Sequence, residues 1–145
     1  MQNKYYIPQY QKLICIGYVR GYSSMVKEYH QKRDEVFHKL HSPSYSNTPV
    51  MGGIGAADEC YNKAAELEKI ETHLDTRIMH AIEQAKLQIG LDCGEDVRQK
   101  LTEAIWECCI TGRNFVCEYW GLPMGKTTFY KYRNKFLFDI ASILR

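Results

Sequence analysis

The sequence predicts an all-α protein, with a long N-terminal helical hairpin followed by a C-terminal three-helix unit that contains a helix-turn-helix. Apolar residues recur at three- and four-residue steps through most of the 145 residues, which is the period of a helix with one buried face. Strand-like segments from which a sheet could be built are missing. Hydrophobic residues make up 45% of the chain and prolines number only 4, which favours a folded chain over a disordered one.

Two long helices are predicted in the N-terminal part of the chain. The first covers residues 10–40, and its apolar stripe leaves the lysines on the opposite face. A loop rich in serine, proline and glycine follows at residues 41–58, HSPSYSNTPVMGGIGAAD. The second helix is expected from Ala57 to Ile89, with Asp58 or a near neighbour as its N-terminal cap. Two amphipathic helices joined by one loop indicate an antiparallel hairpin.

Three shorter helices are predicted in the remainder. Gly90 suits the left-handed residue that ends a helix, and the acidic pair after Gly94 suits the next start. Helices are expected over about residues 95–111, 114–120 and 126–144, with Gly112 ending the first of them. The chain is therefore divided into a helical hairpin with its loop, residues 1–90, and a C-terminal unit, residues 91–145.

The charge distribution points to a polyanionic partner for the C-terminal unit. The net charge of the chain is only +2, but from Leu122 to Arg145 there is one acid, Asp139, against five bases. A basic end on a near-neutral chain is typical of a small module that meets nucleic acid. The chain starts without the apolar run of a signal peptide, and no stretch approaches the roughly 18 apolar residues of a membrane span. We therefore expect a cytoplasmic protein with no membrane partner.

Six cysteines without CxxC spacing fit reduced thiols in a core, as expected for the cytoplasm. Five histidines invite a search for a metal site, but no cysteine pair lies near any of them, and zinc requires four ligands. Glu103 and Glu107 are four residues apart and could be paired carboxylates, but they are better interpreted as part of the solvent-exposed face of their helix. We therefore expect no metal, no cofactor and no enzymatic activity.

The stretch GLPMGKTTFYKYRNKF, residues 121–136, contains the Gly-Lys-Thr of a phosphate-binding loop. That loop requires GxxxxGK[ST] after a buried strand. Here Gly121 gives GxxxGKT, which is one residue short, and no sheet is predicted. Nucleotide binding is therefore disfavoured.

The same residues predict a helix, a tight turn and a second helix. Gly121 can adopt the left-handed conformation that turns the chain, Leu122 packs between the two helices, and Pro123 prevents the first helix from continuing. The second helix is expected to bury a stripe consisting of Phe129, Tyr132 or the stem of Arg133, Phe136, Ile140 and Leu144. Its other face has the chemistry of a major-groove reader, with lysine, threonine and asparagine for base edges and Arg133 and Lys135 for phosphates. The predicted DNA-binding residues are Lys126, Thr127, Thr128, Tyr130, Lys131, Arg133, Asn134 and Lys135.

The segment NFVCEYWGLPMGKTTFYKYRNKFL, residues 114–137, resembles the C-terminal helix-turn-helix of small Gram-positive phage regulators of the RinA/ArpU late-transcription type. That unit is similar to the region of sigma factors that reads promoter DNA. The GLP turn followed by TFYKYRNKF is the most specific part, and the close match covers the C-terminal third of the chain. Upstream, a long helix, a Ser/Pro/Gly loop and a second long helix follow in the same order. The resemblance implies regulation of late phage or prophage genes, including packaging and lysis genes, through double-stranded DNA.

Two other functions remain open. One is a DNA-packaging subunit of the small-terminase kind, which would assemble a ring on DNA. The other is a helical protein-interaction module, in which the basic helix binds an acidic partner. The tyrosines that crowd the first helix fit intramolecular packing and partner contacts equally, and the partner would be a second copy of the chain or RNA polymerase.

Overall fold

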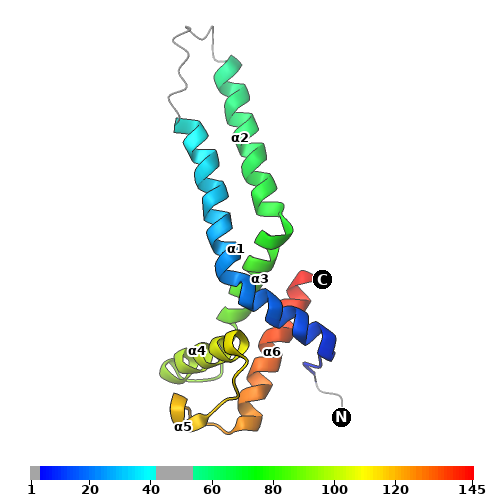
Figure 1. The fold of residues 1–145 in the computed structure, drawn as a ribbon, viewed down its shortest axis with the longest axis vertical. Coiled ribbons are helices and arrows are strands. Elements are labelled where there is room, and N and C mark those ends of the chain that lie inside the picture. The colour runs from blue at the N-terminus through cyan, green and yellow to red at the C-terminus, as the bar shows by residue number, and fades with distance from the viewer. Residues whose placement is uncertain (1–3, 42–53) are drawn as a thin grey trace. The chain divides into compact units, whose positions relative to one another are not determined.

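The structure is a computed structural model that describes residues 4–41 and 54–145 (Figure 1). Over these residues the chain forms six α-helices and no strand, which confirms the all-α fold class. No helix in this part of the chain has the length and apolar character needed to cross a membrane. The helices are α1 (Gln9–His41), α2 (Ile54–Thr72), α3 (Leu74–Leu87), α4 (Glu95–Thr111), α5 (Cys117–Trp120) and α6 (Lys126–Leu144).

The predicted bounds of α1, α4 and α6 are confirmed to within one residue. The end of α4 shows why such bounds can be predicted. Gly112 follows the helix in the left-handed conformation, with φ of 73°, and its N–H donates to the carbonyl oxygen of Cys108. Gly90, which follows α3, also has a positive φ, of 66°. Glycine adopts this conformation without the steric cost that a Cβ imposes, so it marks helix ends in the sequence.

The single helix predicted from Ala57 to Ile89 is wrong, because α2 and α3 are separate helices that meet at His73. The His73 side chain accepts a hydrogen bond at Nδ1 from the backbone N–H of Asp75, at 3.2 Å. The backbone carbonyl oxygen of His73 accepts a hydrogen bond from the N–H of Arg77, at 3.0 Å. A histidine that caps a new helix leaves the apolar periodicity unbroken, and the sequence pattern therefore gives no sign of the interruption.

The predicted loop at residues 41–58 is also corrected at its C-terminal end. Because α2 begins at Ile54, residues 54–58 are helical, and Asp58 lies inside the helix rather than at its cap. Residues 42–53, the rest of the predicted loop, lie outside the described part of the chain.

The helix predicted at residues 114–120 is shorter than expected, because α5 covers only Cys117–Trp120. Val116, a β-branched residue, is extended at φ −124° and ψ 109°. The N–H of Phe115 donates to the hydroxyl of Tyr130 on α6, at 3.1 Å. The Tyr130 hydroxyl thus holds the backbone at Phe115, and the extended Val116 lies directly before α5.

Packing divides the chain into two compact units. One combines the chain up to Tyr22 with Ile78–Arg145, and the other is Ser23–Arg77. The long helix α1 contributes to both. The functional division predicted at residue 90 is a different kind of boundary and stays a prediction.

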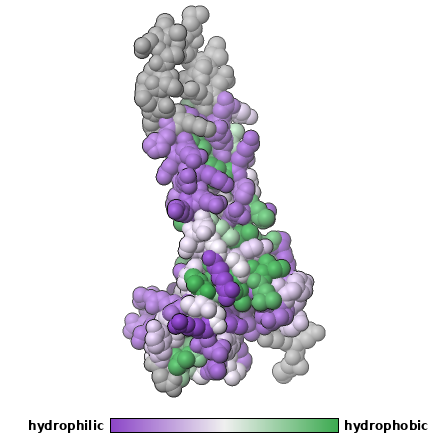
Figure 2. Space-filling model, viewed as in Figure 1, coloured by the Kyte–Doolittle hydropathy of each residue, from purple (hydrophilic) through white to green (hydrophobic). Residues whose placement is uncertain are grey.

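In the unit Ser23–Arg77, α1 and α2 lie side by side (Figure 1) and are joined by a small polar network. The Tyr29 hydroxyl donates to Glu71 Oε1 at 2.5 Å and accepts a hydrogen bond from Arg33 at 3.0 Å. The hydrogen bond to Glu71 and burial raise the pKa of Tyr29. In Figure 2 hydrophilic residues cover most of the described surface of this unit that is in view. The antiparallel hairpin as a whole stays a prediction, since its loop is not described.

The core of the larger unit is built from four helices. The largest fully buried side chains there come from α1, α3, α4 and α6: Val19, Ile82, Leu101, Ile105, Cys109, Phe129, Phe136, Leu137 and Ile140. The buried stripe expected on α6 is confirmed at Phe129, Phe136 and Ile140, whereas Leu144 is only half-buried. Phe129 stacks on Phe115 with ring centroids 4.0 Å apart and planes within 8°. This stack ties the segment before α5 to α6.

Arginines complete the ends of two helices in this unit. Arg20 donates from Nε to the carbonyl oxygen of Cys109 in the last turn of α4, at 2.9 Å. Arg98 donates from Nε to the carbonyl oxygen of Ile89 just after α3, at 3.1 Å. The last carbonyl groups of a helix lack intrahelical hydrogen-bond donors and carry partial negative charge. A guanidinium there both donates the missing hydrogen bond and places a positive charge next to the carbonyls. The N-terminal part of α1 and the start of α4 are therefore joined to their neighbours by polar as well as apolar contacts.

The aromatic and thiol side chains divide between the core and the surface. Tyr22 packs edge-on against Trp106 and donates to Glu83, and burial together with Glu83 raises its pKa to about 12. Tyr6 and Tyr10, by contrast, are 68% and 63% exposed. Cys15, Cys108 and Cys109 are buried, as expected of core thiols, but Cys60 is exposed.

We expect Phe129→Ala to lower the free energy of unfolding by about 3–5 kcal/mol, because it removes a fully buried ring and leaves Phe115 without its stacking partner. Tyr119→Ala is the matched aromatic control, since Tyr119 is 74% exposed, and should change stability by about 0.5 kcal/mol or less. Urea unfolding followed by circular dichroism measures both. Equal effects of the two substitutions would contradict the described core.

Candidate nucleic-acid interface

The turn between α5 and α6 is formed by a left-handed glycine and a buried leucine. Gly121 has φ of 63° and ψ of 32°, and its N–H donates to the carbonyl oxygen of Cys117. Leu122 is buried behind it, with 6% of its surface exposed. Gly125 then precedes α6 in an extended conformation, at φ −81° and ψ 170°. The left-handed conformation expected at Gly121 is thus observed, and the turn sends the chain directly into α6.

One face of α6 is anchored in the core, and this sets which residues face outward. Phe129, Phe136, Leu137 and Ile140 are buried on that face. Helical residues are about 100° apart around the axis, so Thr127 and Lys131 point away from the buried face. The exposed residues predicted to bind DNA lie in the first turns of the helix, and they are Lys126, Thr127, Thr128 and Lys131.

The N-terminus of α6 offers backbone donors to an anion. Gly125 caps the helix without a side-chain hydrogen bond, and the first N–H bonded to its carbonyl is that of Phe129, at 3.0 Å. The amides of residues 126–128 therefore have no partner inside the helix. Free amides at the positive end of a helix dipole are suited to a phosphate.

Three of the predicted DNA-binding residues are engaged inside the fold. Tyr130 accepts the N–H of Phe115 and lies 3.5 Å from Asn114 Oδ1. The Arg133 guanidinium lies over the Tyr130 ring, 4.7 Å from its centroid. Lys135 Nζ lies 2.9 Å from Asp139 Oδ2. DNA contact by these residues stays a prediction, but their positions show that each also supports the fold.

Asn134 lies between the exposed and the engaged residues of this helix. It is half-buried, and its Oδ1 atom is buried without a hydrogen-bond partner among the described residues. The amide is therefore left with hydrogen-bonding capacity that the fold does not use. Bidentate recognition of adenine by asparagine uses both the oxygen and the amide nitrogen, so the shielded Oδ1 would reach a base edge only after the side chain reorients.

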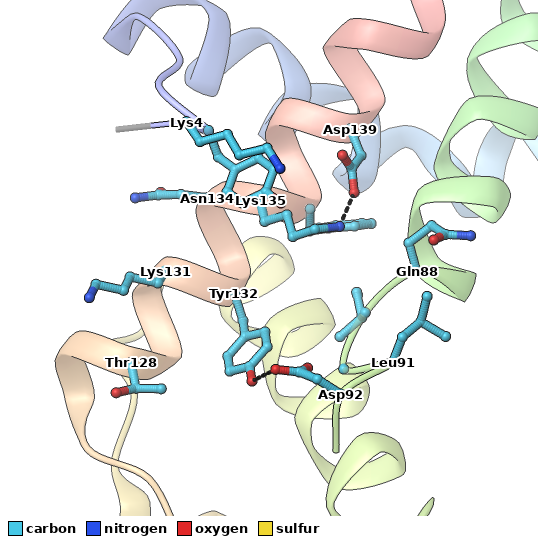
Figure 3. Close-up of a pocket in the computed structure, with 14 residues that line it drawn as sticks. Lys4, Gln88, Leu91, Asp92, Thr128, Lys131, Tyr132, Asn134, Lys135 and Asp139 are labelled. Atoms are coloured by element: carbon cyan, nitrogen blue, oxygen red, sulfur yellow. Dashed lines mark hydrogen bonds and ion pairs between the residues drawn. The ribbon is translucent and has the colours of Figure 1, made fainter. Parts of the chain in front are cut away.

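A groove of about 610 Å³ runs beside α6, and Figure 3 shows the side chains that line it. One wall is α6 from Thr128 to Asp139, and the other is the turn after α3, residues 88–92. A hydrogen bond of 2.9 Å from the Tyr132 hydroxyl to Asp92 joins the two walls. The hydrogen bond to Cys93, burial and the hydrogen bond to Asp92 all raise the pKa of Tyr132. This bond fixes the side of α6 that lies next to the turn.

Two lysines near α6 were not anticipated from the sequence. Lys4 lines the end of the groove and is drawn beside Asn134 and Lys135 in Figure 3. Lys100, on α4, has its Nζ 3.9 Å from the position that a Cβ on Gly121 would occupy, so it lies at the turn. Neither belongs to a motif. Only the tertiary contacts of α1 and α4 with the C-terminal segment bring these charges to the site.

No protein-family model, curated protein or solved structure matches this chain.

The described residues contain no cluster of three or more histidine, cysteine, aspartate or glutamate side chains suited to a metal ion.

We expect Gly121→Ala to destabilise the protein by about 1–2 kcal/mol, because alanine in the left-handed region brings its Cβ close to the backbone. Gly125→Ala is the matched control in the same turn. Its φ is negative and a Cβ there meets nothing within 4 Å, so the change should be about 0.5 kcal/mol or less. Thermal unfolding of the two variants beside the wild type tests this. A larger loss at Gly125 would show that the turn is different from the one described.

Proposed function

We propose that this chain is a sequence-specific DNA-binding regulator of transcription, in which α5, the turn at Gly121 and α6 act as a helix-turn-helix. The observation that carries the proposal is the exposed start of α6, where Lys126, Thr127, Thr128 and Lys131 lie opposite or beside a fully buried apolar face. The major groove is about 12 Å wide and admits an α-helix, and lysine and threonine side chains on such a helix can contact bases and phosphates. The assignment to late phage or prophage genes, including packaging and lysis genes, is supported only by the resemblance of residues 114–137.

The positions of the side chains suggest separate roles along α6. Lys126 is exposed beside the free amides of the first turn, and this combination suits a phosphate. Thr127 and Lys131 face most directly away from the core and are the best placed to meet base edges. Thr128 and Asn134 flank them. Lysine pairs with the O6 and N7 atoms of guanine, so we assign Lys131 to a guanine.

Self-association through the N-terminal helices is part of the proposal. In α1, Leu13 and Ile14 are 60% and 48% exposed beside the exposed Tyr10. A Cβ at Gly17, one turn further along this face, would meet nothing within 4 Å. We propose that a second copy of the chain covers this surface, with RNA polymerase as the alternative partner. A dimer would place two α6 helices about 34 Å apart, one turn of the DNA helix.

DNA binding is tested by fluorescence anisotropy on duplexes, first selected from a random pool, at several salt concentrations. Lys131→Ala should lose about 1–3 kcal/mol of preference for the guanine that it contacts. Lys126→Ala should weaken binding to all sequences and reduce the salt slope by about 1. Lys27→Ala, an exposed lysine in the other compact unit, is the control and should change neither quantity.

If no duplex binds even at low salt, the regulator proposal fails and a protein-interaction module becomes the better explanation. If binding occurs without any sequence preference and the chain forms a closed ring of many copies, a packaging subunit is favoured instead.

For self-association, we expect Leu13→Glu to raise the dissociation constant of the dimer at least tenfold, because it places a charge in an apolar contact. Lys12→Glu introduces the same side chain one position earlier and off this face, and should leave the dimer much less affected. Sedimentation velocity over a range of concentrations measures both. A wild type that stays monomeric at the highest concentration would refute self-association.

A further inference from the structure

The segment before α1 is fixed against the middle of α6. Ile7 is buried, with only 3% of its surface exposed. The Tyr5 ring packs edge-on against Phe138 of α6, with centroids 5.6 Å apart and an interplanar angle of 70°. Lys135 Nζ lies over the same ring, 5.5 Å from its centroid. Residues 4–8, here called the N-terminal arm, are thereby held beside a helix that lies at the other end of the sequence.

The arm adds a cation to the side of α6 that carries Asn134. Lys4 is exposed and its Nζ lies 5.5 Å from the centroid of the Tyr5 ring. In Figure 3 its side chain lies beside Asn134 and Lys135. Among the described residues no carboxylate forms an ion pair with Lys4 or with Lys131. Neither ammonium group is therefore compensated by an ion pair among these residues, and both can contact an anionic partner.

Lys135, which the sequence placed on a phosphate, is in a different situation. Its ammonium forms an ion pair with Asp139 at 2.9 Å, and the two side chains are only 31% and 20% exposed. The same ammonium also lies over the face of the Tyr5 ring. A lysine held between a carboxylate and an aromatic ring fixes the position of that ring, and much of its charge is already compensated.

We propose that the N-terminal arm is part of the DNA-binding surface, that Lys4 contacts a backbone phosphate beside α6, and that Lys135 positions the arm without touching DNA. This inference rests on the proposed function. A flexible lysine ammonium acts as a point charge toward phosphate and carries no sequence information, so Lys4 contributes affinity and salt dependence but no base preference. The arm thus supplies the backbone contact that the sequence had assigned to Lys135.

The test compares Lys4→Gln with Lys12→Gln, a lysine on α1 in the same compact unit, on the preferred duplex and on a scrambled one. Lys4→Gln should weaken binding to both duplexes equally, by about fivefold at 0.15 M salt, and lower the salt slope by about 0.9. Lys12→Gln should leave affinity and slope unchanged. Circular dichroism verifies that each variant is folded.

A double-mutant cycle separates the role of Lys135 from that of Lys4. If Lys135 acts only by positioning the arm, Lys135→Gln lowers the salt slope in the wild type but has little further effect in Lys4→Gln. If Lys135 itself touched DNA, the two losses would add and the slope would fall by about twice as much.

The inference is overturned if the wild type binds DNA and Lys4→Gln retains the full slope, or if the two losses add. The proposed function survives either result. If the wild type binds no duplex at low salt, the inference and the proposed function fail together.

Discussion

The burial of the Phe129 ring against Phe115 fixes how α6 is rotated about its own axis. A helix has one rotation that buries a given set of side chains, and Phe129, Phe136 and Ile140 are almost completely excluded from solvent. Every statement about what α6 presents to a partner follows from that rotation. A shift of one residue, which turns the helix by about 100°, would place Lys131 near the core boundary. The chemistry of the outer face is therefore determined by packing on the inner one.

The polar residues of α6 are used differently along its length. In the first turns the lysine and threonine side chains are exposed and the backbone amides are free. In the middle, Tyr130, Tyr132 and Lys135 are engaged with residues from three other parts of the chain. Because the engaged residues hold the helix in place, the exposed ones can be presented in a fixed geometry. Fixed geometry is what reading a base edge requires, since a misplaced side chain loses both hydrogen bonds of a bidentate contact.

Local signals made much of the fold predictable. Gly90 and Gly112, together with helical periodicity, predicted the bounds of α4. Two of the misses share a different physical origin, because each depends on a side chain acting on a backbone. His73 caps a helix within an unbroken apolar stripe, and Tyr130 satisfies the amide of Phe115 from fifteen positions further along. The candidate site was partly predictable for the same reason: the outward residues of α6 follow from its period, whereas Lys4 reaches them only through the tertiary contacts of Tyr5 and Ile7.

The joining of both ends of the chain in one core has a consequence for how the molecule forms. Cys15 and Val19 of α1 are buried in the same compact unit as Ile140 of α6. The buried face of α1 therefore cannot be fully covered until α6 has been synthesised. Contacts between such distant segments carry a large loop-closure entropy and slow the folding of a small protein. A fragment that began after α3 would also lack the apolar residues that cover α4 and α6. The nascent chain thus remains without its finished core, and without a correctly presented α6, until α6 itself has been synthesised.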